Sequence, residues 1–166
     1  MTRKSLSRNI QRRINNLPSK LKVEINTTEH FQVLAPRVSP YFIDSEWFKG
    51  SCTIVTYELE ELIATKLRAL YQRRKGRDLF DLWLVFSKGL ADINEVIKIF
   101  HRYFKHDGIS ITRDLFHQNM LQKRLNKDFQ VDMNVLLPDQ TRWEFDDAFE
   151  FVLNNVVSML DGTCRR

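Results

Sequence analysis

The sequence predicts an α+β protein in which a small sheet precedes a helical body. Strand-like segments lie before residue 57, and helical periodicity follows it almost to the C-terminus. Strands grouped early and helices grouped late are typical of α+β architecture. A chain of 166 residues is long enough to bury a substantial hydrophobic core. We therefore expect two parts, a basic helix with strands over residues 1–57 and a helical domain over residues 58–166.

The N-terminal segment carries all of the net positive charge. Residues 1–23 hold seven basic residues and no acidic one, whereas the remainder holds 19 basic and 21 acidic residues. Such a segment is typical of a phosphate-binding arm for nucleic acid, a targeting peptide or the solvated face of a helix. We favour a helix whose inner edge is Ile10, Ile14 and Leu17. RNA contact through Arg8, Arg12 and Arg13 is the main alternative.

Three short segments have strand character. Leu21–Asn26 alternates apolar and polar residues, which predicts a half-buried strand with Glu24 on its polar face. Phe31–Leu34 and Cys52–Thr56 are the other two, and the loop expected between them contains Pro36, Pro40, Trp47 and Gly50. A sheet of three brief strands leaves an edge or a face poorly covered.

Five helices are expected after the strands, over residues 58–75, 79–87, 93–106, 113–126 and 146–160. Asp92 with Glu95 matches a capping box at the start of the third helix, and Gly108 is a suitable stop for it.

One lysine stands out in the first helix. Lys66 follows Leu59, Leu62 and Ile63 at helical spacing, so its stem leaves the apolar stripe. An ammonium group there is costly unless it is paired. Two acids, Asp78 and Asp81, begin the next helix after Gly76. A basic run lies between the helices: Arg73, Arg74, Lys75 and Arg77.

Two interpretations of this helix junction are open. In the structural one, Asp78 is an N-cap, Asp81 imitates a capping box, and Lys66 snorkels or forms an ion pair with either acid. In the functional one, the lysine and the basic run hold phosphates.

The cysteines, the histidines and the lack of long apolar runs argue against several classes of protein. Cys52 and Cys164 have no partner at metal or redox spacing, so we expect free thiols in a reducing compartment, the cytoplasm. The four histidines show no zinc-site spacing. No apolar run is long enough to span a membrane.

Four segments resemble the AbiEii/AbiGii toxin family of nucleotidyltransferases, the toxin halves of bacterial type IV toxin–antitoxin and abortive-infection systems. They are LKVEINTTEHF (21–31), TYELEELIATKLRALYQRRKGRDLFDLW (56–83), FHQNMLQKRLNKDFQVDMNVLLP (116–138) and WEFDDAFEFV (143–152). The resemblance implies a partial nucleotidyltransferase core before residue 58, Mg²⁺ and a nucleoside triphosphate as cofactors, and an antitoxin partner.

The resemblance also assigns residues. Glu24 matches the third metal-binding carboxylate, Lys66 the distal lysine and Asp78 the distal acid, with Arg77 and Asp81 beside them. Carboxylates holding Mg²⁺ and a lysine meeting phosphate oxygens suit nucleotidyl transfer.

The family's Gly-Ser and Asp-x-Asp motifs have no match before Leu21. We therefore expect a chain similar to the C-terminal part of such a toxin, inactive alone and able to transfer nucleotides to RNA or another acceptor only when completed by those motifs. The alternatives are a non-catalytic module that binds RNA or a protein partner or self-associates, and a folded remnant without activity.

Overall fold

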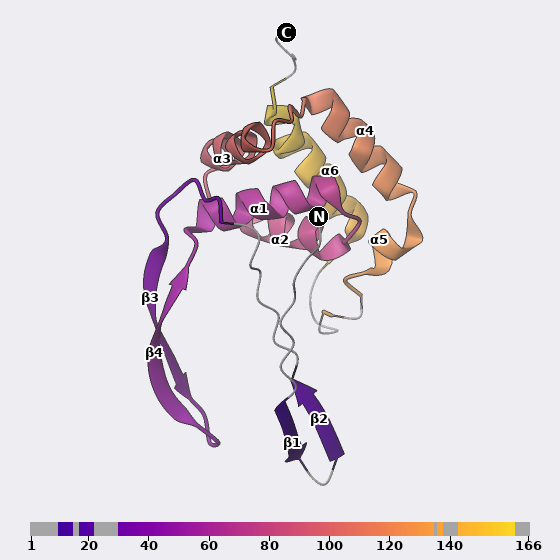
Figure 1. Ribbon diagram of the computed structural model, residues 1–166. Helices are drawn as coiled ribbons and strands as arrows, with labels where there is room; N and C mark the ends of the chain where they lie inside the picture. Colours follow the sequence, from indigo (N-terminus) through magenta and orange to yellow (C-terminus); the bar gives the residue numbers. More distant parts are fainter. Residues whose placement is uncertain (1–9, 15–16, 22–29, 135, 138–142, 162–166) are drawn as a thin grey trace. The chain divides into compact units, whose positions relative to one another are not determined.

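The computed structural model describes residues 10–14, 17–21, 30–134, 136–137 and 143–161 (Figure 1). The α+β class predicted from the sequence is confirmed, because strands precede a helical region. The chain divides into two compact units, Met1–Phe31 and Gln32–Arg166, which are described separately. The boundary expected at residue 57 stays a prediction.

The first unit contains an antiparallel hairpin of β1 (Ile10–Ile14) and β2 (Leu17–Leu21). The expected basic helix is therefore wrong over these residues. Pro18 would interrupt the interior of a helix, whereas a two-stranded hairpin accepts proline because both of its strands are edges. The strand expected at Leu21–Asn26 lies outside the described residues beyond Leu21, as does Glu24.

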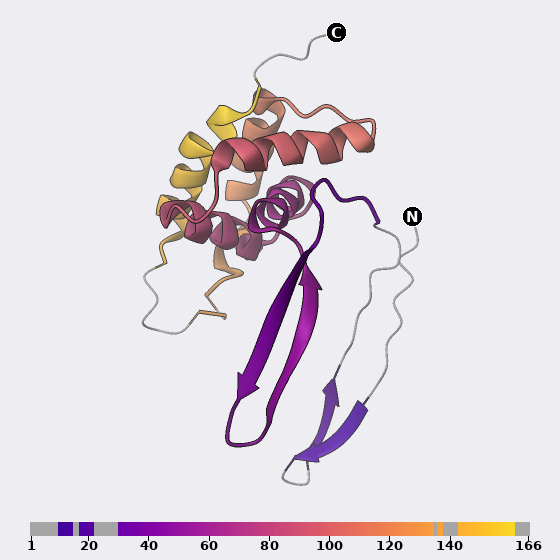
Figure 2. The same ribbon diagram turned by 90° about the vertical axis from the view of Figure 1, so that its left-hand side faces the viewer.

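The second unit begins with a longer hairpin, β3 (Arg37–Asp44) and β4 (Lys49–Thr56). It pairs antiparallel from Arg37↔Thr56 to Asp44↔Lys49 and forms the twisted ribbon in Figure 2. The strand predicted at Cys52–Thr56 is confirmed as the second half of β4. The loop expected around Pro40 is wrong, because Pro40 lies within β3.

Residues 31–34 do not form the expected strand. The backbone N–H groups of Val33 and Leu34 donate instead to the carboxylate of Glu61, at 2.7 and 2.8 Å. A side chain therefore satisfies the donors that a strand would have given to a neighbour.

The predicted helices are present with small changes of length. They are α1 (Leu59–Gln72), α2 (Gly76–Ser87), α3 (Ile93–His106), α4 (Arg113–Arg124) and α6 (Phe145–Asn155), the last followed by the 3₁₀ turn η1 (Val157–Met159). The short helix α5 (Lys127–Val131) was not predicted from the sequence.

The expected stops and caps of α3 are mostly correct. Asp92 is its N-cap and accepts a hydrogen bond from the backbone N–H of Asn94 at 2.8 Å. Glu95 does not complete a capping box, since it pairs with Lys98 at 3.0 Å. Gly108 follows the helix with φ +71°, a left-handed conformation that favours glycine.

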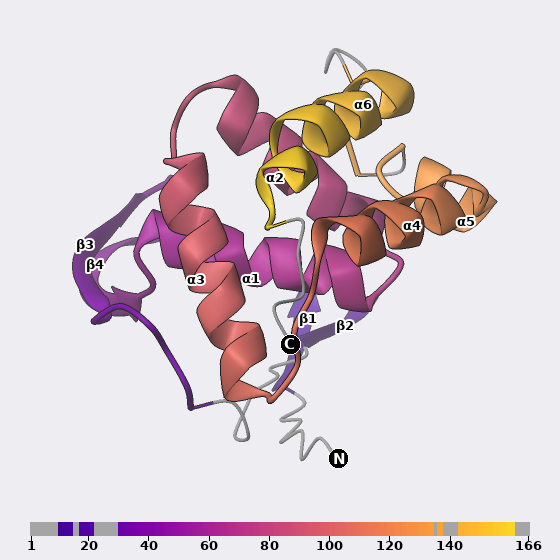
Figure 3. The ribbon, with the colours of Figure 1, turned by 90° about the horizontal axis from the view of Figure 1, so that it is seen from above.

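The helices pack around α1, which contacts α2, α3 and α4, while α6 covers α2 (Figure 3). Their shared core is rich in fully buried aromatic side chains: Phe100, Phe104, Phe116, Phe129 and Phe149. In the part of the chain that is described, no helix combines the length and apolar character needed to cross a lipid bilayer.

Gly76 lets α2 begin against α5. A Cβ at this position would lie 2.5 Å from the carbonyl oxygen of Phe129 and 3.1 Å from Cβ of Asp132. The backbone oxygen cannot move aside as a flexible side chain would. The close approach of the two elements therefore depends on glycine.

We expect Gly76→Ala to lower the free energy of unfolding by about 1–3 kcal/mol, because the added methyl group overpacks this contact. Denaturant unfolding followed by circular dichroism measures the change. Gly50→Ala is the matched control: its Cβ would meet only the ring of Phe48 at 2.8 Å, and that ring is exposed and free to turn. Equal effects of the two substitutions would contradict the proposed role of Gly76.

Candidate functional site at the junction of α1 and α2

A buried carboxylate organises the junction of α1 and α2. Asp78 lies in the first turn of α2 and is fully buried. Arg73, the C-cap of α1, donates to it through two parallel hydrogen bonds, Nε to Oδ2 and Nη2 to Oδ1, both 2.7 Å. The hydrogen bond with Asp78 is the largest influence on the guanidinium and raises the pKa of Arg73. The positive end of the α2 dipole also favours a carboxylate here.

Lys66 lies beside this pair and contacts both predicted acids. Its Nζ is 2.7 Å from Oδ2 of Asp81 and 3.9 Å from Oδ1 of Asp78. The side chains of Lys66 and Asp81 are 31% and 35% exposed, so this ion pair faces solvent while Asp78 does not. The structure therefore brings three of the predicted site residues together.

Solvent-exposed cations surround the same junction. Arg74, Lys75 and Arg77 are all exposed in the turn between the helices and at the start of α2. Arg77 also donates its backbone N–H to the carboxylate of Asp132 at 3.2 Å. The junction therefore presents more positive than negative charge to solvent.

Parts of both sequence interpretations need correction. Asp78 is not an N-cap; that position belongs to Lys75, which makes no side-chain cap bond. The ion pair expected for Lys66 is present, but Asp81 is its nearer partner and Arg73 occupies Asp78. Leu62, expected on the buried stripe, is exposed, which places Lys66 at the margin of the stripe. Glu24, predicted to be catalytic and to bind metal, lies outside the described residues.

A second buried carboxylate, Glu61, was not predicted from the sequence. Glu61 is fully buried in α1 and accepts from the hydroxyl of Tyr103 at 2.6 Å as well as from the N–H groups of Val33 and Leu34. Burial, and then this hydrogen bond, raise the pKa of Tyr103. Glu61 precedes the buried Ala64 by three residues, and this helical spacing was the available sign that Glu61 lies on the buried face of α1. All three donors are far away in the sequence, which points to a structural role.

A buried lysine, also missed, closes the end of α1. Lys123 on α4 donates from Nζ to the carbonyl oxygens of Leu70 and Tyr71, the latter at 2.8 Å. Burial, with a smaller effect of Arg74, lowers the pKa of Lys123 to about 8, against an opposing effect of Asp78. This ammonium satisfies carbonyl groups that have no partner within the helix.

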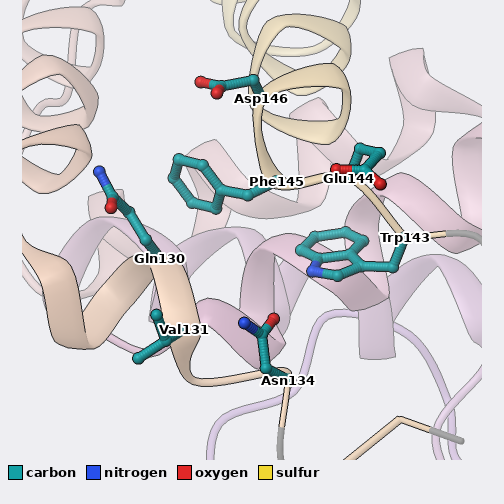
Figure 4. Close-up of a pocket in the computed structure, with 7 residues that line it drawn as sticks. All are labelled: Gln130, Val131, Asn134, Trp143, Glu144, Phe145 and Asp146. Atoms are coloured by element: carbon teal, nitrogen blue, oxygen red, sulfur yellow. The ribbon is translucent and has the colours of Figure 1, made fainter. Parts of the chain in front are cut away.

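A pocket of about 450 Å³ lies elsewhere, between α5 and the start of α6 (Figure 4). Its lining includes Gln130, Asn134, Trp143 and Asp146. Asp146 is paired with Arg124 at 2.7 Å, and the indole N–H of Trp143 has no hydrogen-bond partner among the described residues. None of the predicted site residues lines this pocket.

The described residues do not fit a magnesium site. Among them, no three His, Cys, Asp or Glu side chains gather as metal ligands. The carboxylate of Asp78 is occupied by Arg73 and that of Asp81 by Lys66. Mg²⁺ prefers several oxygen ligands in octahedral geometry, which these two engaged carboxylates do not provide.

Comparison with known protein families gives a match over most of the chain. A family model described as "Nucleotidyl transferase AbiEii toxin, Type IV TA system" matches residues 3–151, most of the chain. No curated protein and no solved structure gives a significant match.

Asp78→Ala is expected to lower the free energy of unfolding by about 2–4 kcal/mol, because the guanidinium of Arg73 loses both of its hydrogen bonds to the buried carboxylate. Asp81→Ala, which removes a solvent-facing partner, should cost about 0–1 kcal/mol. Denaturation midpoints of the two variants and the native chain give the comparison. If Asp81→Ala proves the more destabilising, the buried pair does not organise the junction.

Lys123 should make stability depend on pH in the alkaline range. The pKa of Lys123 is about 8 in the folded chain and near its ordinary 10.5 when unfolded. Between these values the unfolded chain binds more protons, so the free energy of unfolding should rise as pH increases from 8 to 10.5. Lys123→Met should lack this rise. Urea unfolding of both proteins at several pH values tests this prediction. The free energy of unfolding of the native chain minus that of Lys123→Met should increase from pH 8 to 10.5, and a value that stays constant or decreases would contradict the prediction.

Proposed function

Since the chain belongs to the AbiEii family of nucleotidyltransferase toxins from type IV toxin–antitoxin systems, we propose that its α1–α2 junction binds the phosphates of a nucleoside triphosphate. The observation that carries the proposal is the position of Lys66: half-buried at its stem, paired at its tip with the solvent-facing Asp81, and adjacent to a cluster of exposed cations.

Lys66 is the cation best able to exchange its partner for a phosphate. The ion pair with Asp81 is partly exposed, and such pairs contribute only about 0–1 kcal/mol. An arriving phosphate carries more charge than one carboxylate and accepts strong hydrogen bonds from an ammonium group. Asp81 thus holds the lysine in position before the anion binds.

Arg73 has a different role from Lys66 in this proposal. Its guanidinium is committed to the buried Asp78 by two short hydrogen bonds, so its charge is already neutralised. Breaking that pair would leave an uncompensated buried carboxylate. Arg73 and Asp78 therefore fix the junction, whereas Lys66, Arg77 and their exposed neighbours receive the ligand.

The junction supplies phosphate binding only. Nucleotidyl transfer to RNA or another acceptor also needs the family's Gly-Ser and Asp-x-Asp motifs, so we propose that the chain is inactive alone and acts in the cytoplasm when these are supplied. Glu24 is proposed as the third of the family's metal-binding carboxylates, the other two belonging to the missing motifs. No cluster of three or more metal-ligand side chains occurs among the described residues, so Mg²⁺ would depend on the missing motifs and Glu24 for its ligands.

Membership of a type IV toxin–antitoxin family implies an antitoxin partner. The second candidate function is a binding module, favoured by the hairpin of β1 and β2, whose strands contain Arg12, Arg13 and Lys20. Two-stranded ribbons of this kind are one of the ways in which proteins contact nucleic acid. In this version RNA is the ligand, and the α1–α2 junction binds nothing.

Nucleoside triphosphate should raise the melting temperature of the native chain in a dose-dependent manner. A ligand at ten times its Kd stabilises the folded state by about 1.4 kcal/mol, which corresponds to a few degrees for a chain of this size. Lys66→Ala should abolish most of the shift. The matched control is Lys98→Ala, because Lys98 is also a helical lysine paired with an acid but lies away from the junction.

A flat response up to millimolar nucleotide in the native chain would refute the phosphate site. The binding-module alternative would then be supported by salt-sensitive RNA binding that survives Lys66→Ala and is lost when Arg8, Arg12 and Arg13 are neutralised. Inorganic triphosphate, tested in parallel, separates recognition of phosphates from recognition of the nucleoside.

A further inference from the structure

The hairpin of β3 and β4 exposes apolar side chains on both faces. Among the described residues, its two strands pair only with each other. Val38, Phe42 and Val55 lie on one face and are 63–72% exposed, and the opposite face carries Tyr41, Ile43 and Ile54 at 39–49%. An isolated two-stranded hairpin is at best marginally stable in water. A ribbon with this composition therefore gains from added strands.

The outer edges of the two strands differ in their hydrogen-bonding groups. The N–H of Ser45 donates to the carbonyl of Phe48 at 3.0 Å, so Ser45 directs its backbone toward β4. In an antiparallel pair, inward and outward backbone groups alternate along each strand. Two-residue steps from Ser45 reach Ile43, Tyr41 and Ser39, which also point inward. Pro40 therefore points its nitrogen outward, to the free edge of β3.

Pro40 closes one edge and leaves the other open. Proline has no N–H, so it interrupts the edge of β3 against further pairing. The same alternation turns four residues of β4 outward, Lys49, Ser51, Thr53 and Val55, and all of them have an N–H group. Only one of the eight residues of β4 is charged. The edge of β4 is thus suited to strand addition.

We propose that the edge of β4 pairs antiparallel with β4 of a second copy of this chain, which makes a four-stranded sheet across a two-fold axis. Outward-facing residues of one copy must pair with outward-facing residues of the other. The central register that meets this condition places Ser51 opposite the partner's Thr53 and Cys52 opposite the partner's Cys52. Cys52 is exposed and forms no disulfide within the chain.

The charges and small residues of β4 favour a second copy as the occupant. In this register Lys49 lies opposite the partner's Val55, so the two lysines do not face each other, and each stays paired with Asp44 of its own chain at 2.7 Å. Ile54 lies opposite the partner's Gly50, whose missing side chain is replaced by the exposed ring of the partner's own Phe48, so two apolar groups meet there. Because Pro40 blocks β3, the assembly stops at four strands and does not grow into a fibre.

Sedimentation velocity over a range of concentrations tests the proposal on the whole chain. We expect a reversible dimer in the native protein and at least a tenfold weaker one in Thr53→Pro, which removes an outward N–H from β4. Val38→Pro is the matched control, because it removes an outward N–H from the edge of β3, and it should dimerise as the native chain does. Circular dichroism confirms that both variants keep their helices.

Mild oxidation tests the register. In a Cys164→Ser background, Cys52 should form a disulfide-linked dimer, and Cys52→Ser should abolish it. A chain that remains monomeric at all concentrations, or a dimer indifferent to Thr53→Pro, would overturn the proposal. A proline-sensitive dimer without the Cys52 disulfide would support the β4 edge and overturn the central register.

Discussion

The arrangement of the helical body depends on keeping one carboxylate away from water. Asp78 is fully buried at the start of α2, and a buried carboxylate is tolerated only when its charge and lone pairs are matched. Arg73 provides that match from the end of α1, which fixes how the two helices meet. The close approach at Gly76 and the reach of Lys66 to Asp81 both rely on this meeting.

The same junction shows why one lysine and one arginine have different roles. The planar guanidinium of Arg73 matches a carboxylate through two bonds, whereas the ammonium of Lys66 is a compact charge that accommodates different acceptors. The structure uses arginine where the partner is buried and lysine where the partner is partly exposed. In the proposed phosphate site, the ligand therefore meets Lys66, which leaves Asp81 at little cost, beside the pair of Arg73 and Asp78, which stays intact.

The features that depend on residues close in sequence were predicted from the sequence. Apolar periodicity located the five long helices, and spacing along them brought Lys66 close to Asp78 and Asp81. The pairing of Arg73 with Asp78 required the geometry of the turn at residues 73–75, which spacing alone does not give. Glu61 was missed because its donors, Val33, Leu34 and Tyr103, lie 27–42 residues away. Pro40 hid β3, because proline usually marks a loop, although a hairpin edge accepts it.

The ribbon of β3 and β4 is attached to the helical body at both of its ends. Glu61 holds the chain just before β3 through Val33 and Leu34, β4 runs within two residues into α1, and Arg37 lies 3.8 Å from Glu58 across the base. Both strands are thus anchored independently of the connection between them at residues 45–48. A protease that nicks this tip would leave two strands still tethered, and the cut protein would migrate as one particle until denatured.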